Sequence, residues 1–373
     1  MPGPPTTNRF ATMVDGSCHE RRSPLSASGG VAARSRAAES SVVAAFRRIP
    51  GRTEVPMTSM MIPSGSFRFP AARSVPDLLL RRMRLAWREA RPVVQIIFLL
   101  RFAAGAALGA AGSAYGAVNR PALLEAALGW LAATWAVYLL NGIADVVEDR
   151  ANGQVRPIAR GELSRRSAST IVGALSVAAL VFAAAVSTTQ LLLTAAMLGV
   201  GWAYSLGPWP LKANLGGFVA AVTALGMLTY LAGWSAAGGG RVTEPVFLFG
   251  LMMSLWMGLG GSTKDLADAK GDRLAGRKTL PVLLGDGPAR AVMAVAAGSV
   301  GSVFAVLCAV RGSVVLPAAV VVLAGSAVLS GTVLTSLSRG ARSAQRRPYR
   351  VFMVTQYCAH IALFGCLGLT SPL

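Results

Sequence analysis

Charged residues, and acidic residues above all, are scarce in this chain. Only 14% of its 373 residues are charged, and just 16 are Asp or Glu, whereas a soluble domain usually carries about 25% charged residues. Histidine occurs only twice, and the four cysteines form no C-x-x-C pair, which argues against a zinc site or a disulfide scaffold. The chain is instead 53% hydrophobic, with a mean hydropathy of +0.54. These values are typical of an integral membrane protein.

The charge that is present is strongly basic. Lysine and arginine number 36 and give a net charge of +20. A basic excess can indicate nucleic-acid binding, but that interpretation requires a soluble domain with a basic face. Here the basic residues lie between long apolar runs, so the cytoplasmic loops of a membrane protein explain them better. We therefore expect the lipid bilayer as a partner and no nucleic acid.

The N-terminal region differs from the rest of the chain. It is rich in Arg, Ser, Pro, Ala and Gly without a sustained hydrophobic period, which is typical of a disordered segment. It has no continuous apolar run near its start, so we expect no secretory signal peptide, and Met57 is one of several methionines that offer alternative starts. The basic, amphipathic stretch 77–88 suits a membrane interface. We therefore expect a basic arm over 1–76 and a membrane domain over 77–373.

From Pro92 onward the chain consists of apolar stretches of about 18–25 residues, the length that crosses a bilayer as a helix. They predict an all-α membrane bundle of about nine transmembrane helices in the cell membrane. If the N-terminus is cytoplasmic, the outer loops contain only Arg120, Arg241 and Arg311, and the other loop Lys and Arg lie inside. This asymmetry predicts a cytoplasmic N-terminus and an outer C-terminus. The expected spans lie near 93–117, 122–144, 167–187, 189–206, 214–236, 245–264, 288–310, 313–336 and 350–371.

Acidic residues cluster at the ends of two predicted spans, both on the predicted cytoplasmic side. The first cluster has a spacing of four residues and the second follows i, i+3, i+7, so each is expected to lie on one face of a helix. The residues are Asn141, Asp145 and Asp149 after the second span, and Asp265, Asp268 and Asp272 after the sixth.

Stacked carboxylates at a bilayer edge repel one another and lose hydration, so they require a cation or basic partners. Oxygen ligands favour Mg²⁺ over zinc, and Mg²⁺ commonly combines one or two carboxylates with water and substrate phosphate oxygens. The pair of clusters therefore indicates Mg²⁺-bridged diphosphate binding. The plainer alternative is that these are solvated loop charges near Arg and Lys. A transporter with acidic ion sites is a further alternative, but it would place carboxylates near the midplane, often at broken helices.

The motifs resemble those of the UbiA superfamily of intramembrane prenyltransferases. Asn141-x-x-x-Asp145-x-x-x-Asp149, followed by Arg156-Pro-Ile-Ala-x-Gly161, is similar to its first signature, and Lys264-Asp265-x-x-Asp268-x-x-Gly271-Asp272-Arg273 is similar to its second. Tyr204-Ser-x-x-Pro-x-x-Leu-Lys212 resembles the tyrosine–lysine segment after the fourth helix. Many members have Asn-Asp at the start of the first motif, whereas this chain has Gly142.

The resemblance implies a helical bundle around a central cavity and the use of Mg²⁺ as cofactor. It assigns catalytic roles to Asp145, Asp149, Asp268 and Asp272. It places metal ligands at Asn141, Asp145, Asp149, Asp265, Asp268 and Asp272. Diphosphate binding would involve Asn141, Arg156, Tyr204, Lys212 and Lys264.

The implied reaction transfers a prenyl group from an isoprenyl diphosphate to an aromatic acceptor of the hydroxybenzoate or quinone-precursor type. Terpene cyclisation on the same scaffold and prenyl transfer to a non-aromatic acceptor stay open as alternatives. Two further polar residues fall within predicted spans. Arg101 would be costly in lipid, so it is expected to face the bundle interior, where it is also a candidate substrate contact. His360 could contact an acceptor, but a packed, hydrogen-bonded role is the simpler expectation.

Overall fold

The computed structural model describes residues 75–112 and 118–370. Most of the predicted arm over 1–76, including Cys18 and Met57, lies outside the described residues. The described residues form helices, and their only β-type pairing is an isolated bridge between Asn214 and Lys278. The predicted all-α class is therefore confirmed.

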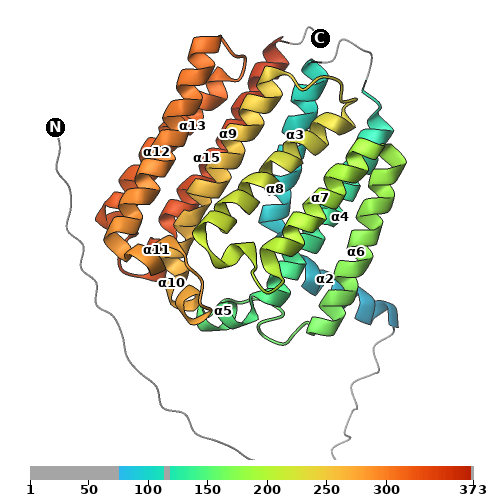
Figure 1. Cartoon of the computed structure of the whole chain (residues 1–373). Coiled ribbons are helices and arrows are strands. Elements are labelled where there is room, and N and C mark those ends of the chain that lie inside the picture. The colour runs from blue at the N-terminus through green and yellow to red at the C-terminus, as the bar shows by residue number, and fades with distance from the viewer. Residues whose placement is uncertain (1–74, 113–117, 371–373) are drawn as a thin grey trace, which may run out of the picture. The chain divides into compact units, whose positions relative to one another are not determined.

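The helices run in chain order as a series of long elements interrupted by short ones (Figure 1). The long helices are α3 (Pro92–Ala111), α4 (Arg120–Ala144), α6 (Arg165–Val186), α7 (Thr188–Ser205), α8 (Leu215–Ala236), α9 (Glu244–Gly260), α12 (Asp286–Arg311), α13 (Leu316–Leu334) and α15 (Arg347–Thr370). The short elements are α2 (Val75–Glu89), α5 (Val146–Ala151), α10 (Asp265–Leu274), α11 (Leu280–Leu284), α14 (Arg342–Gln345) and the 3₁₀ turns η2 (Leu211–Ala213), η3 (Gly261–Lys264) and η4 (Ser336–Ser338).

Within the described residues, eight helical segments are long and apolar enough to cross a membrane. One of them runs over Glu244–Leu274 and joins α9, η3 and α10. Helix α7 falls outside these eight, although it was predicted as a ninth span. It has 18 residues, but it begins with Thr188, Thr189 and Gln190, which lower its hydropathy. A multi-pass membrane bundle is thus confirmed, and the count of nine holds only approximately.

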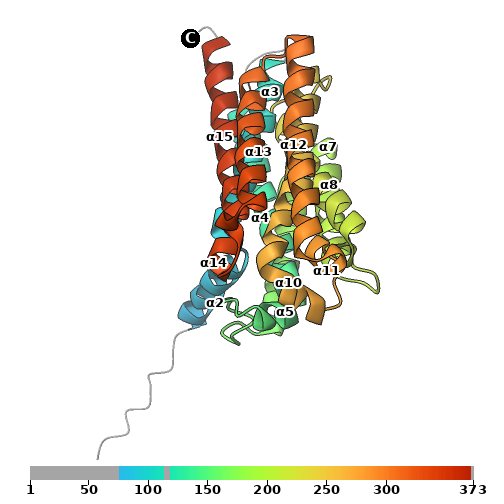
Figure 2. The same ribbon diagram turned by 90° about the vertical axis from the view of Figure 1, so that its left-hand side faces the viewer.

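The long helices pack side by side, and the short ones α5, α10 and α11 gather at one end of the bundle (Figures 1 and 2). Neighbours in the bundle include α3 with α8, α4 with α6, and α13 with α15. Helices α3 and α8 are especially close. A Cβ on Gly105 would overlap the backbone of Tyr230, and a Cβ on Gly233 would overlap that of Phe102. Small residues allow such close contact between membrane helices, and here they fix the wall of the cavity described below.

Helix α2 is amphipathic, as the sequence predicted, and starts two residues earlier than expected. Leu85 and Ala86 are buried in a small cluster with Leu139 and Ile158, whereas Leu79 on its N-terminal part is exposed. This helix reaches the bundle at the end where α5 and α10 lie (Figure 2). It therefore packs beside the first acidic motif.

Candidate functional site at one end of the bundle

The first acidic motif lies where α4 ends. The helix stops at Ala144, and Asp145 forms the junction with α5. The Asn141 side-chain amide donates a hydrogen bond of 2.6 Å to Asp145 Oδ2, and Lys212 forms a buried ion pair with the other carboxylate oxygen. Burial by itself would raise the pKa of Asp145, but the Lys212 ammonium, together with Arg277 and Lys264, holds that pKa below its ordinary value. This carboxylate is therefore ionised and already neutralised.

Asp149 turns to different partners. Its Oδ2 lies 2.8 Å from Arg156 Nη1, and the same nitrogen is 3.8 Å from Glu89 Oε1 on α2. Glu89 also accepts a hydrogen bond of 2.9 Å from the backbone N–H of Ile158. Burial, followed by the nearby Asp145 charge, raises the pKa of Asp149 to about 7.

Gly142 has a structural explanation. A Cβ at this position would meet the Glu89 carboxylate, with Cγ 2.9 Å and Cδ 3.0 Å away. Glu89 thus fills the space that a side chain at 142 would need. This chain has Gly142 at the position where many family members have an Asp next to the Asn. The carboxylate of Glu89, from α2, lies at that place instead.

The three carboxylates of the second motif have different surroundings. Asp272 accepts hydrogen bonds of 3.3 Å from Arg277 and from Thr279. Asp268 pairs with Arg342 at 2.7 Å and with Arg346 at 3.4 Å. Asp265 is 3% exposed and, among the described residues, its carboxylate has no ion-pair partner within 4 Å.

A direct contact joins the two motifs. The Asn152 side chain, just after α5, accepts a hydrogen bond of 3.0 Å from the backbone N–H of Gly271 and donates one of 3.3 Å to the carbonyl of Asp268. A Cβ on Gly271 would overlap the Asn152 side chain, so a larger residue here would displace Asn152 from these hydrogen bonds. The predicted juxtaposition of the motifs at one end of the bundle is therefore present in the structure.

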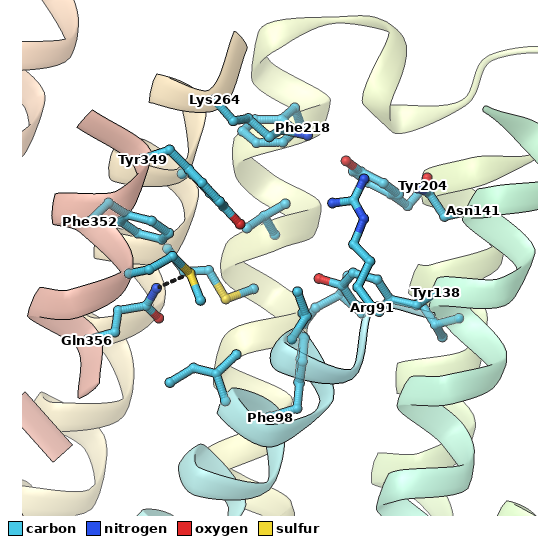
Figure 3. A pocket seen from close by; sticks show the side chains of 18 of the residues that line it. Arg91, Phe98, Tyr138, Asn141, Tyr204, Phe218, Lys264, Tyr349, Phe352 and Gln356 are labelled. Carbon is cyan, nitrogen blue, oxygen red and sulfur yellow. Dashed lines mark hydrogen bonds between the residues drawn. The ribbon is translucent and has the colours of Figure 1, made fainter. Parts of the chain in front are cut away.

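A cavity opens beside these motifs between α3, α4, α8 and α15 (Figure 3). The part of the cavity next to the motifs is polar, and most of its remaining wall is apolar. The polar residues next to the motifs are Arg91, Lys264, Arg277, Tyr138, Tyr204, Tyr349, Asn141 and Asp145, and Arg101 and Gln356 are polar residues of the deeper wall. The apolar wall includes Val94, Ile97, Phe98, Val222, Leu225, Met257 and Phe352.

The predicted site residues divide into two groups. Four of them line the cavity, namely Asn141, Asp145, Tyr204 and Lys264. The others lie outside the cavity lining, and all of them except Asp265 pair with one another or with neighbouring side chains. They are Asp149, Arg156, Lys212, Asp265, Asp268 and Asp272.

Two cavity residues were not among the predicted site residues, although Ala90-Arg91-Pro92 is part of the resemblance to the UbiA family. Arg91 precedes Pro92 and has a left-handed backbone, with φ of 58°, which points its side chain toward Tyr204 and Tyr138 (Figure 3). Tyr349 comes from α15 at the other end of the chain. An Arg-Pro pair and a single tyrosine are common in any sequence, and only the packing of α15 against α3 brings these two side chains to one cavity.

The donor set fits Mg²⁺ held partly by substrate. No three or more His, Cys, Asp or Glu side chains in the described part of the chain lie close enough to hold a metal on their own. The available donors are carboxylate and amide oxygens, which suit a hard cation that keeps water and phosphate oxygens as further ligands. Asp265, buried without an ion-pair partner, is the carboxylate that such a cation would most directly compensate. The six predicted ligands therefore do not form one preassembled cage.

The two interior polar residues lie where the sequence suggested. Arg101 is buried and lines the deeper part of the cavity. His360 is fully buried, with Nε2 2.9 Å from the Tyr230 hydroxyl and Nδ1 2.7 Å from the Gln356 carbonyl oxygen. It is absent from the cavity lining, which fits the packed role.

Comparisons with known proteins agree on the fold and the family. Residues 102–355 match the UbiA prenyltransferase family. A digeranylgeranylglyceryl phosphate synthase of Halobacterium salinarum is 36% identical over 187 residues, which cover 48% of this chain and 63% of that protein. The same enzyme of Haloquadratum walsbyi is 37% identical over 161 residues, covering 42% and 54%. The matched stretch thus spans less than two thirds of these curated relatives.

Solved structures show the same fold. A UbiA homolog from Archaeoglobus fulgidus bound to GPP and Mg²⁺ aligns with a TM-score of 0.57 at 18% identity, covering 76% of this chain and 99% of that one. A structure described for digeranylgeranylglyceryl phosphate synthase in membranes aligns with a TM-score of 0.55 at 15% identity, covering 77% and 99%. At these identities the likeness establishes the fold.

Proposed function

Because the chain belongs to the UbiA prenyltransferase family, we propose that it transfers a prenyl group from an isoprenyl diphosphate within the membrane. The observation that carries this proposal is the two-part cavity. Three cations, Arg91, Lys264 and Arg277, line its polar part, and an apolar wall follows directly. An isoprenyl diphosphate has the same division between a polyanion and a hydrocarbon chain.

The side chains have separate tasks in this proposal. Arg91 and Arg277 can each grip phosphate oxygens with two N–H groups, while Lys264 contributes a point charge. The Lys264 ammonium lies 5.5 Å from the centre of the Phe218 ring, which keeps it at the boundary of the two parts. The Tyr204 hydroxyl at the same boundary can donate to a phosphate oxygen.

Asn141, Asp145 and Asp265 are the residues that would hold Mg²⁺, with Asp149, Asp268 and Asp272 as further carboxylates of the same end. Bound there, Mg²⁺ would neutralise negative charge that develops on the leaving diphosphate. The UbiA homolog from Archaeoglobus fulgidus was solved with GPP and Mg²⁺ and, in a second structure, with DMAPP and Mg²⁺, which supports both the donor class and the metal.

In the reaction, the bond between C1 of the prenyl group and the diphosphate oxygen breaks, and its electron pair leaves with the diphosphate. A nucleophile on the acceptor forms the new bond to C1, and its proton leaves with the released diphosphate. The cations of the polar part stabilise the leaving group. The apolar wall keeps water away from the electron-poor C1 atom.

The acceptor is best taken as non-aromatic. The curated relatives are named for the synthesis of a glyceryl phosphate, and this favours the alternative over the aromatic acceptor expected from the motifs. We therefore propose a glyceryl phosphate that already carries one prenyl ether, with its free hydroxyl as the nucleophile. The membrane orientation with a cytoplasmic N-terminus belongs to the same proposal, since it places both acidic motifs on the cytoplasmic side, where soluble diphosphates and Mg²⁺ occur.

The test uses membranes that contain the full chain. They are incubated with Mg²⁺, with geranyl, farnesyl or geranylgeranyl diphosphate, and with either geranylgeranylglyceryl phosphate or a panel of phenolic acids, and products are identified by mass spectrometry. Formation of a second prenyl ether on the glyceryl phosphate is expected. Prenylated phenolic acids as the sole products would restore the aromatic acceptor, and no diphosphate release with any acceptor would refute prenyl transfer.

A further inference from the structure

The cavity has a second polar region that the diphosphate does not explain. Arg101 and Gln356 both line it, deeper in the bundle than Arg91. Arg101 comes nine residues after Pro92, the first residue of α3, which corresponds to about 14 Å along the helix axis at 1.5 Å per residue. Figure 3 shows Gln356 below Phe352 on α15, away from Lys264 and Tyr204. The cations that the proposed function assigns to the diphosphate are Arg91, Lys264 and Arg277, so Arg101 and Gln356 are left without a ligand.

Arg101 is a buried cation without an acidic partner. Its side chain is 2% exposed, and among the described residues no carboxylate lies within ion-pair distance of it. The guanidinium donates a hydrogen bond to Gln356 Oε1 and lies 5.1 Å from the centre of the Phe98 ring. Its Nε atom is buried and has no hydrogen-bond partner in the structure. A buried charge left in this state is costly, and a bound anion would offset the cost.

The side chains around Arg101 offer further hydrogen-bond donors to the same region of the cavity. The Gln356 amide nitrogen has only the Met353 sulfur as a partner, at 3.6 Å, so it remains able to donate to a stronger acceptor. His360 Nδ1 donates to the Gln356 carbonyl oxygen, so His360 Nε2 accepts from the Tyr230 hydroxyl. Tyr230 lies next to Arg101, and the hydrogen bond to His360 fixes the orientation of the Tyr230 hydroxyl. The region thus presents N–H donors and a positive charge without a competing carboxylate, which selects an anion.

We propose that Arg101 and Gln356 bind the anionic group of the acceptor, a phosphate or a carboxylate. This inference rests on the proposed function, because it requires an acceptor in the same cavity as the donor. Side chains on a helix lean toward its N-terminus, so the Arg101 guanidinium is directed back toward the diphosphate region. An acceptor held by its anionic group at this depth can extend its nucleophile toward C1 of the prenyl group.

The experiment compares ligands that differ in one charge. Equilibrium binding to the purified full chain in detergent micelles is measured for geranylgeranylglyceryl phosphate and for neutral geranylgeranylglycerol. The same measurement with 4-hydroxybenzoate and 4-hydroxybenzyl alcohol distinguishes a phosphate from a carboxylate. Hydrogen bonds from a buried cation to an anion correspond to about 10- to 100-fold in affinity, so the wild-type chain should prefer the anionic member of one pair by that factor.

The variants separate an anion site from a structural role. Arg101→Met removes the cation, and Gln356→Glu keeps Arg101 but places a carboxylate against it; both should bring the preference to within about twofold. Arg101→Lys should retain most of it. Gln190→Glu is the matched control for a new buried carboxyl, because Gln190 lies on α7, has no side-chain hydrogen bond and is absent from the cavity lining. Its preference should equal that of the wild type.

Binding of geranyl diphosphate with Mg²⁺ is measured in parallel. This donor binding should stay unchanged in Arg101→Met. If Arg101→Met does not fold, the anionic preference of Gln356→Glu tests the proposal instead. An unaltered anionic preference in Gln356→Glu, no preference in the wild type, or an equal loss of donor binding would each overturn the proposal. Failure of the wild type to release diphosphate would refute the proposed function alone, because the binding ratios still report on Arg101.

Discussion

Replacing Lys212 with Met is the sharpest test of how this site is built. Lys212 is 6% exposed and pairs with Asp145, whose side chain is 10% exposed. Removing one partner of such a buried pair leaves an uncompensated carboxylate, at a cost of about 3–5 kcal/mol. Asn141 donates its hydrogen bond to Asp145 in the wild type and in the variant alike, so this bond does not change the difference between them. We therefore expect Lys212→Met to lower the free energy of unfolding by about 3–5 kcal/mol.

The double variant Asp145→Asn with Lys212→Met separates charge from packing. Both charges are then gone, so at least half of the lost stability should return, and the coupling between the two sites should exceed about 1 kcal/mol. Unfolding in detergent micelles, followed by tryptophan fluorescence against denaturant, measures both values. The double variant should still release no diphosphate, because the proposed Mg²⁺ site uses the Asp145 carboxylate. A loss below about 1 kcal/mol in Lys212→Met would contradict the assignment of a buried, mutually dependent pair.

Three further predictions follow from close contacts and from the metal. Gly142→Asp should lower thermal stability by about 1–3 kcal/mol through its clash with Glu89, and adding Glu89→Ala should reverse most of that loss; an unchanged melting temperature would mean that Glu89 does not occupy this space. Gly105→Val should separate α3 from α8 and lower the melting temperature, whereas Gly199→Ala, which has nothing within 4 Å, should leave it equal or slightly higher. Chelation with EDTA should stop diphosphate release, and Mg²⁺ should restore it, while Asp268→Ala should remain inactive with Mg²⁺ although it inserts normally; full activity in that variant would remove Asp268 from the site.

The architecture was largely predictable because membrane spans depend on local hydropathy. Each predicted span coincides with a long helix, and the single discrepancy is α7, where Gln190 and two threonines weaken an otherwise sufficient run. The adjacency of the two acidic motifs was also predictable, since both end their helices on the same side. Asn141 and Asp145 contact each other as their spacing indicates.

The partners of the acidic residues were not predictable from spacing. The helix breaks at Asp145, so Asp149 turns toward Arg156 and α2. Asp268 turns toward Arg342, which follows α13 much later in the chain. Each of these carboxylates except Asp265 pairs with a basic residue from another part of the chain, and such pairs depend on tertiary packing. Glu89 is the clearest case, because neither the sequence around Glu89 nor the sequence around Gly142 indicates that these two residues lie in contact.

The junction between α2 and α3 has a mechanical consequence. Only Ala90 and Arg91 separate the two helices, and Arg91 is the sole non-glycine residue with positive φ in the described part of the chain. At its other side, Glu89 anchors α2 to the segment after α5. A change in the tilt of α2 would therefore be passed through these two residues to the backbone of Arg91, and so to one of the cations that line the cavity.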